Sequence, residues 1–256
     1  MSDAIVLLHG AATGSSSWDP IAGSLASSGA NVFAPDMLGY GQSPLPTDPY
    51  GIELEVAHLA RSLDRQHIGA LHLVAHSLGS LIGLHLRRAL DDRVTKMTLI
   101  ELVVVSVLRE GGEDAAYAEM EEQYQRFMGL FADPEAAAHF FVDHWSGPGA
   151  WDSMGKRARA AVTSLVPKLR LEMIATRSDT AKLDWLTESP CPTTILVGEN
   201  TLLAPRAVAR QLAPALRATI TVVPGAAHMI PITHPKVAAD AIQGDGAGAA
   251  ARAKIP

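Results

Sequence analysis

Leu73-Val74-Ala75-His76-Ser77-Leu78-Gly79-Ser80 is the stretch that decides the fold of this 256-residue chain. An apolar run from Leu71 to Ala75 predicts a buried strand, and a helical pattern begins directly after Ser77. Small residues stand two positions before the serine and two positions after it, as Ala75 and Gly79. Where a strand turns tightly into a helix, the two elements nearly touch and only small side chains fit there. The stretch therefore predicts a serine hydroxyl that stands clear of the sheet, and the alternative is a serine that caps an ordinary helix.

This spacing is the nucleophile elbow pattern G-x-S-x-G, with alanine in place of the first glycine, and the chain resembles the α/β-hydrolase superfamily over nearly its whole length. Two further stretches carry the resemblance: His9-Gly10-Ala11, after the first apolar run, and Pro224-Gly225-Ala226-Ala227-His228, after the last one. A third stretch, residues 35–43, is similar to the family loop D-x-x-G-x-G-x-S. In that loop we expect the Asp36 carboxylate to accept bonds from backbone N–H groups.

The order of the elements predicts an α/β fold with a mostly parallel sheet of about six strands. Short apolar runs predict strands at 4–8, 31–34, 71–75, 95–100, 192–198 and 218–223. The resemblance implies that the first two strands of the family are lacking, as in plant methylesterases and hydroxynitrile lyases. Strand patterns disappear between about 105 and 185, where helical patterns cover 113–131, 134–145, 153–165 and 167–177.

These patterns divide the chain into three parts. We expect an α/β-hydrolase core formed by residues 1–104 and 186–243, and an inserted helical cap formed by residues 105–185. The aromatic and methionine side chains of the cap are expected to cover the mouth of a catalytic cleft. The Gly/Ala-rich residues 244–256 are expected to form a frayed tail.

Composition excludes several classes of partner. The net charge is −6 and no basic block is present, which argues against nucleic acid and against an anionic membrane surface. Cys191 is the single cysteine, so no intrachain disulfide can form. The first apolar run is too short for a signal peptide or a membrane helix, and we therefore expect a cytoplasmic protein. The sequence gives no indication of the oligomeric state.

Ser77, an acid and His228 would follow the chain order of the superfamily triad. A serine hydroxyl is a poor nucleophile, and an imidazole must take its proton during attack. Of the ten histidines, only His228 lies in a Gly-rich loop directly after a terminal strand, which makes it the expected base. The resemblance implies that the N–H groups of Leu78 and Ala11 bind the oxyanion, and that His9 braces the oxyanion loop.

The acid is where this sequence departs from the common family pattern. The usual segment is a strand, a glycine, two polar residues and an aspartate, but here Thr201 stands at the acid position of Gly198-Glu199-Asn200-Thr201. Haloalkane dehalogenases and zearalenone lactonases carry the acid after the strand that follows the elbow helix, and Glu101 matches that position. We expect Glu101 to be the acid, with two alternatives: Glu199, or a Ser77–His228 pair that works without an acid.

The predicted function is acyl transfer to water by a Ser–His–Glu triad. The substrate would be a small carboxylic ester or lactone with an apolar part, and neither a cofactor nor a metal is implied. A serine at position 77 argues against dehalogenase chemistry, which needs a carboxylate nucleophile. Cleavage of a C–C bond, or hydroxynitrile lyase chemistry, would use the same triad and stays open as an alternative. A non-catalytic small-molecule receptor is the second alternative.

Overall fold

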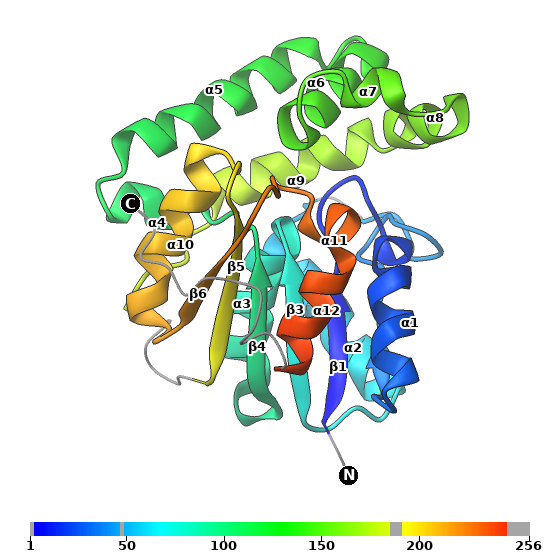
Figure 1. Ribbon diagram of the computed structural model, residues 1–256. Coiled ribbons are helices and arrows are strands. Elements are labelled where there is room, and N and C mark those ends of the chain that lie inside the picture. The colour runs from blue at the N-terminus through cyan, green and yellow to red at the C-terminus, as the bar shows by residue number, and fades with distance from the viewer. Residues whose placement is uncertain (1–2, 47–48, 185–190, 245–256) are drawn as a thin grey trace.

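The computed structural model describes residues 3–46, 49–184 and 191–244, and in this part of the chain six strands form one parallel sheet (Figure 1). The order across the sheet is β2-β1-β3-β4-β5-β6. The strands are β1 (Ala4–Leu8), β2 (Val32–Phe33), β3 (Leu71–His76), β4 (Val94–Ile100), β5 (Thr193–Gly198) and β6 (Thr219–Val223). Every neighbouring pair is parallel, so the expected α/β fold with a sheet of about six strands is confirmed.

Helices cover both faces of the sheet. One face packs against α1 (Asp19–Ser27) and α12 (Pro235–Gln243), which contact each other, and a short turn η1 (Ser15–Trp18) leads into α1. The other face packs against α2 (Ile52–Arg65), α3 (Leu78–Leu90) and α10 (Leu203–Ala215). A short turn η2 (Asp91–Arg93) joins α3 to β4. All six residues of β3 are buried, as expected for a central strand covered on both faces.

The carboxyl ends of the strands meet at one edge of the sheet, and this places the loops that follow them side by side. His76 at the end of β3 pairs with Ile100 at the end of β4, so Ser77 and Glu101 leave neighbouring strands at the same level. The Ser77 N–H donates to the Ile100 carbonyl at 3.0 Å, and the Glu101 N–H donates to the Leu196 carbonyl at 3.0 Å.

A layer of helices lies above this edge of the sheet. It contains α5 (Asp114–Leu130), α6 (Pro134–Ser146), α7 (Ala150–Ser153), α8 (Lys156–Ser164) and α9 (Val166–Ser178). The short helix α4 (Val105–Glu110) leads into this layer and packs against α10. Figure 1 shows α5 to α8 at the top of the molecule, with α9 between them and the sheet. The sequence-based boundary at 185–186 and the tail after Gly244 lie outside the described residues.

Several elements differ from the sequence prediction. The helices α4 and α11 (Ile230–Thr233) were not expected, because four to six residues give no periodic pattern. Helix α10 begins at Leu203. The Glu119 carboxylate of α5 accepts the N–H of Ala204 at 2.7 Å, so a residue distant in sequence supports this first turn.

No helix in the described residues is long and apolar enough to span a bilayer.

Candidate active site

The backbone at Ser77 has the strained conformation that a sharp strand-to-helix turn requires. Its φ of 54° and ψ of −124° lie in a region that side chains other than glycine rarely occupy. Ser77 directly precedes the first residue of α3, so the hydroxyl stands at the amino end of a buried helix. The side chain is 8% exposed and faces a cavity.

Gly79 and Ala75 are small because this turn brings backbone against backbone. A Cβ atom at Gly79 would lie 2.5 Å from the His9 carbonyl oxygen and 2.7 Å from that of Leu8. Farther along α3, a Cβ atom at Gly83 would lie 3.3 Å from that of Ala75. The elbow helix therefore lies directly against the ends of β1 and β3.

Three side chains from three different strand ends form one hydrogen-bonded series. The Nε2 atom of His228 lies 2.9 Å from the Ser77 hydroxyl, and its Nδ1 atom lies 3.2 Å from a Glu101 carboxylate oxygen. All three residues are buried. The structure thus brings together the three residues that the sequence singled out as nucleophile, base and acid, in the order that such a triad uses.

The Glu101 carboxylate is fixed by donors besides His228. The Gly198 N–H donates to Oε1 at 2.5 Å, and the Thr201 hydroxyl donates to Oε2. Thr201 is the residue that stands at the usual acid position of the family. Its hydroxyl therefore supports the candidate acid Glu101, which follows the neighbouring strand β4.

Glu199, the alternative acid, points to another partner. Its carboxylate accepts the Gly225 N–H at 2.9 Å and is exposed, on the surface of the loop that leads to His228. Arg206 donates to the Glu199 carbonyl at 2.8 Å. Glu199 thus holds the turn before His228, and its carboxylate bonds to Gly225 rather than to the imidazole.

The residues expected to bind an oxyanion line the same cavity as Ser77. Leu78 provides the first backbone N–H of α3, and Ala11 follows the tight turn at Gly10. A Cβ atom at Gly10 would lie 2.9 Å from His76 Nδ1 and 3.0 Å from the Ser77 Cβ, so the turn passes directly beside Ser77. His9 accepts the Met37 N–H at Nε2 (3.1 Å) and donates from Nδ1 to the Gly10 carbonyl (2.8 Å), which ties the turn to the loop after β2.

His76 holds the backbone of the loop that carries His228. Burial lowers the pKa of His76 to about 3, with the His228 ring as a smaller cause, so its imidazole is neutral near pH 7. Its Nε2 atom lies 2.9 Å from the His228 carbonyl and donates to it. This contact joins the residue before Ser77 to the candidate base, and nothing in the sequence pattern indicated it.

A cavity of about 480 Å³ opens at Ser77 and His228 beneath the helical layer. Apolar side chains form most of its wall on the helical side, among them Met120, Phe141, Trp145, Leu169 and Met173. The Trp145 ring lies 4.3 Å from the His228 ring, centre to centre. A helix of the layer therefore contacts the candidate base directly.

The described residues contain no group of three or more His, Cys, Asp or Glu side chains arranged to hold a metal ion.

Asp36, which the sequence predicted to bind backbone N–H groups, accepts the Ser15 N–H at 2.8 Å. Gly41 is required beside it, because a Cβ atom there would lie 1.9 Å from the Asp36 carboxylate.

Comparisons with known proteins agree with this architecture. A lipase (LipV) of Mycobacterium tuberculosis is 38% identical over 73 residues, and the match covers 28% of this chain and 28% of the lipase. A 2-hydroxy-6-oxo-2,4-heptadienoate hydrolase of Pseudomonas putida is 34% identical over 117 residues, which covers 44% of this chain and 42% of that enzyme. The matches thus span less than half the length of these two relatives.

The solved structure of a thermophilic esterase from Thermogutta terrifontis superposes with a TM-score of 0.76 at 19% identity, over 95% of this chain and 89% of the esterase. At this identity the superposition shows a shared fold. The model of the family described as "Alpha/beta hydrolase family" matches residues 5–241. The chain belongs to the alpha/beta hydrolase family.

Proposed function

We propose that this protein is a serine hydrolase that cleaves a carboxylic ester or a lactone through an acyl-enzyme. Ser77 is the nucleophile, His228 the general base and Glu101 the acid that orients the base. The observation that carries the proposal is the hydrogen-bonded series Ser77 Oγ, His228 Nε2, His228 Nδ1 and Glu101 Oε2, with distances of 2.9 and 3.2 Å. This geometry supports transfer of the serine proton to the imidazole during attack.

The reaction then follows in two halves. Ser77 Oγ bonds to the carbonyl carbon while His228 takes its proton, and the C–O bond to the leaving alkoxide breaks as His228 returns that proton. A water molecule next attacks the acyl-enzyme and gives a proton to His228. The bond to Ser77 breaks, Ser77 regains the proton, and the carboxylic acid leaves. In a lactone the leaving alkoxide stays attached to the acyl group, so one hydroxy acid is the product.

The oxyanion formed in each half needs donors that are already in place. The N–H groups of Leu78 and Ala11 fill this role in our proposal, because they flank Ser77 and line the cavity. The amino end of α3 adds a partial positive charge at the same point. These steps use side chains, backbone and water only, and the proposal includes no cofactor and no metal.

The apolar cavity supports a substrate with an apolar acyl or alcohol part. We further propose that residues 105–185 act as a cap over a core formed by 1–104 and 186–243. Cap side chains such as Phe141 and Met173 then contact the apolar part of the substrate.

The test is a fluorophosphonate probe combined with short p-nitrophenyl esters and aliphatic lactones. We expect stoichiometric labelling of Ser77 and turnover of at least one ester or lactone. In the Ser77→Ala variant, labelling is lost and kcat falls about 10⁶-fold. Ser80→Ala is the matched control, because the Ser80 hydroxyl donates to the Ala75 carbonyl and lies one turn away. Retention of ester turnover in Ser77→Ala would refute the proposal.

C–C bond hydrolysis is the second candidate function. The observation that favours it is the 34% identity to a 2-hydroxy-6-oxo-2,4-heptadienoate hydrolase over 117 residues. The compound 2-hydroxy-6-oxo-2,4-heptadienoate is therefore the substrate that discriminates between the two functions. Labelling of Ser77 with turnover of this dienoate, and of no ester or lactone, would favour the second function. Labelling without turnover of any of these compounds would favour the lyase or receptor alternatives.

A further inference from the structure

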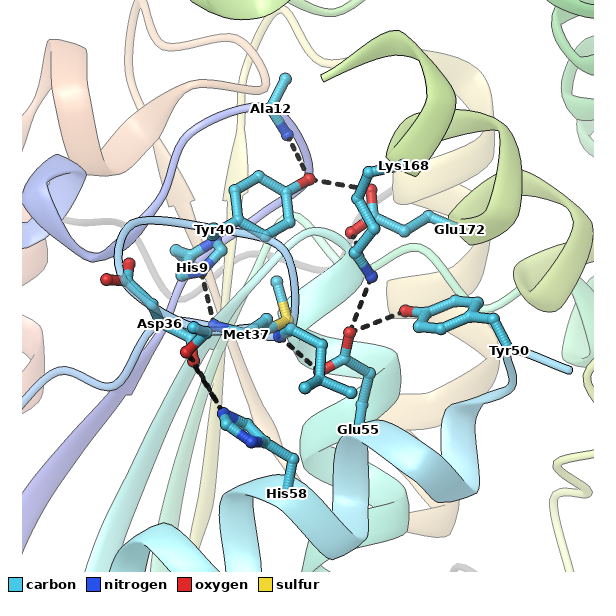
Figure 2. A network of polar contacts seen from close by, with 12 residues as sticks. His9, Ala12, Asp36, Met37, Tyr40, Tyr50, Glu55, His58, Lys168 and Glu172 are labelled. Atoms are coloured by element: carbon cyan, nitrogen blue, oxygen red, sulfur yellow. Dashed lines mark hydrogen bonds and ion pairs between the residues drawn. The ribbon is translucent and has the colours of Figure 1, made fainter. Parts of the chain in front are cut away.

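A cluster of buried polar side chains, which we call the Tyr40 cluster, lies beside the cavity (Figure 2). It consists of Tyr40, Glu55, Lys168 and Glu172. Tyr40 comes from the loop after β2, Glu55 from α2, and Lys168 and Glu172 from α9 of the helical layer. The Glu55, Lys168 and Glu172 side chains are at most 2% exposed. The cluster therefore joins the sheet layer to the helices above it through charges that water does not reach.

The contacts within the cluster run from the ion pairs to the backbone beside the proposed oxyanion donor. Lys168 Nζ lies 2.7 Å from Glu55 Oε1 and 3.3 Å from Glu172 Oε1. The Tyr40 hydroxyl donates to Glu172 Oε2 at 2.9 Å and accepts the Ala12 N–H at 3.0 Å. Figure 2 shows this series as a continuous line of dashes from Lys168 through Glu172 and Tyr40 to Ala12.

Ala12 is held in a conformation that an alanine rarely adopts. Its φ of 62° lies in the left-handed region, which disfavours a residue with a Cβ atom by about 1 to 2 kcal/mol. Such a conformation persists only where its surroundings enforce it. The Ala12 N–H bond to Tyr40 is a contact that can do so, and Ala12 shares a peptide unit with Ala11, the residue next to it in the turn.

Tyr40 is suited to this double role. Burial raises its pKa well above the usual value, with Glu172 as the next cause, so the phenol keeps its proton and can accept from Ala12 while it donates to Glu172. A buried ion-pair cluster is weak support for stability, because removing the charges from water offsets most of their attraction. A role in fixing geometry explains better why the cluster lies against the oxyanion turn.

Resting on the proposed function, we propose that Tyr40 is a positioning residue for the oxyanion hole. Its bond to the Ala12 N–H fixes the direction of the Ala11 N–H, and Glu172 and Lys168 of α9 hold the Tyr40 hydroxyl in place. The helical layer thereby contributes to transition-state stabilisation without touching the reacting atoms.

The first test is Tyr40→Phe, which removes the hydroxyl and keeps the ring. We expect kcat for the best ester to fall about 10- to 100-fold with KM changed less than about threefold, since the oxyanion forms only in the transition state. Inhibition by a trifluoromethyl ketone, whose hemiketal oxygen occupies the oxyanion hole, should weaken by a similar factor. If Tyr40 served only in packing, the loss in inhibitor affinity would not match the loss in kcat.

Tyr50→Phe is the matched control. Tyr50 donates to Glu55 Oε1 at 2.9 Å, so its removal also takes a phenol from a buried carboxylate of the same cluster. The Tyr50 hydroxyl bonds to Glu55 and not to the oxyanion turn, so kcat and inhibitor affinity should stay within about twofold of the wild type. Equal losses in Tyr50→Phe and Tyr40→Phe would overturn the proposal.

A measurement that needs no turnover separates this proposal from the proposed function. Hydrogen exchange of the Ala12 amide should accelerate in Tyr40→Phe and not in Tyr50→Phe. Unchanged exchange in Tyr40→Phe overturns the positioning role, whereas absence of Ser77 labelling in the wild type overturns the proposed function. If Tyr40→Phe fails to fold, Glu172→Ala and Glu172→Gln replace it. Only the glutamine keeps an acceptor for Tyr40, so it should lose less kcat than the alanine.

Discussion

Glu101 combines two features that are unusual for a glutamate. It is fully buried, and its φ of 52° lies in the left-handed region. The strained backbone turns the side chain back across the end of β5, where the Gly198 N–H, Thr201 and His228 meet its carboxylate. Strain at such a residue points to a functional demand on its direction, because a surface glutamate would relax to an ordinary conformation.

The first prediction concerns this carboxylate. Glu101→Gln keeps the size of the side chain but removes the charge that stabilises an imidazolium, and its amide can also impose the wrong tautomer on His228. We expect kcat to fall about 10⁴-fold, with the fold intact by circular dichroism. Glu199→Gln is the control and should lose far less. A larger loss in Glu199→Gln than in Glu101→Gln would contradict this assignment.

Single residues also show how far sequence reasoning reaches. Ser77 and His228 could be predicted because each lies in a short pattern that a local turn dictates. Glu101 could be predicted because Thr201 occupied the usual position, but the bond between these two residues could not. Tyr40 gave no signal, since its contact with Glu172 joins residues 132 positions apart and depends on how α9 packs.

Among the elements, the position of α3 depends on the absence of a side chain at Gly79. Its first turn packs against the backbone carbonyls of Leu8 and His9, which a residue larger than glycine at position 79 would displace. The strands and long helices were predictable, because burial on both faces gives a strand a short apolar run and burial on one face gives a helix a period of 3.6 residues. Short helices such as α4 and α11 are set by tertiary contacts, and their ends carry no such period.

The second prediction compares two glycines in helices. Gly79→Ala would put a Cβ atom 2.5 Å from the His9 carbonyl and should lower the free energy of unfolding by on the order of 3 kcal/mol. Gly129→Ala, in α5, meets nothing within 4 Å and should raise it by about 1 kcal/mol through helix propensity. Urea denaturation of both variants measures the difference. Equal stability of Gly79→Ala and the wild type would contradict the close packing of α3 against the His9 carbonyl.

The whole molecule buries several histidines as neutral rings, and this sets its response to acid. Burial lowers the pKa values of His9 and His144 to about 4, and those of His72 and His76 to about 3. Unfolding returns these rings to the ordinary value of 6.5, so the unfolded chain takes up protons that the folded chain refuses. Their contribution to stability is complete above 6.5 and is lost as the pH falls below it.

Glu172 acts in the opposite direction. Burial raises its pKa from 4.5 to about 7, while Lys168 opposes that shift. Between about pH 4.5 and 7, the folded state therefore holds a proton on Glu172 that the unfolded state has released. Its contribution therefore falls as the pH rises from about 4.5 to 7. Four histidines against one glutamate leave a net uptake of about three protons on unfolding near pH 5.

The third prediction follows from this balance. The free energy of unfolding should decrease as the pH falls from 6.5 through 5, by about 1.36 kcal/mol per pH unit for each net proton taken up on unfolding. His72→Gln, which keeps a polar partner for the Thr98 hydroxyl, should reduce that slope by about one proton. Urea denaturation between pH 4.5 and 7 gives the slopes. An unchanged slope in His72→Gln would mean that this ring is charged in the folded protein.

The contact between the Trp145 and His228 rings has an optical consequence. An indole is fluorescent, and a protonated imidazole at 4.3 Å quenches it, whereas a neutral imidazole does so weakly. Trp151 stacks on His139, and Trp145 itself also lies 4.9 Å from the His144 ring, so a variant with both Trp151→Phe and His144→Gln removes these two other histidine contacts. In that background we expect emission to change during turnover, and the change to vanish when Trp145 is also replaced by phenylalanine. The proton transfer that we propose for His228 would then be visible as a change in emission, and stopped-flow fluorimetry could follow it without a coloured substrate.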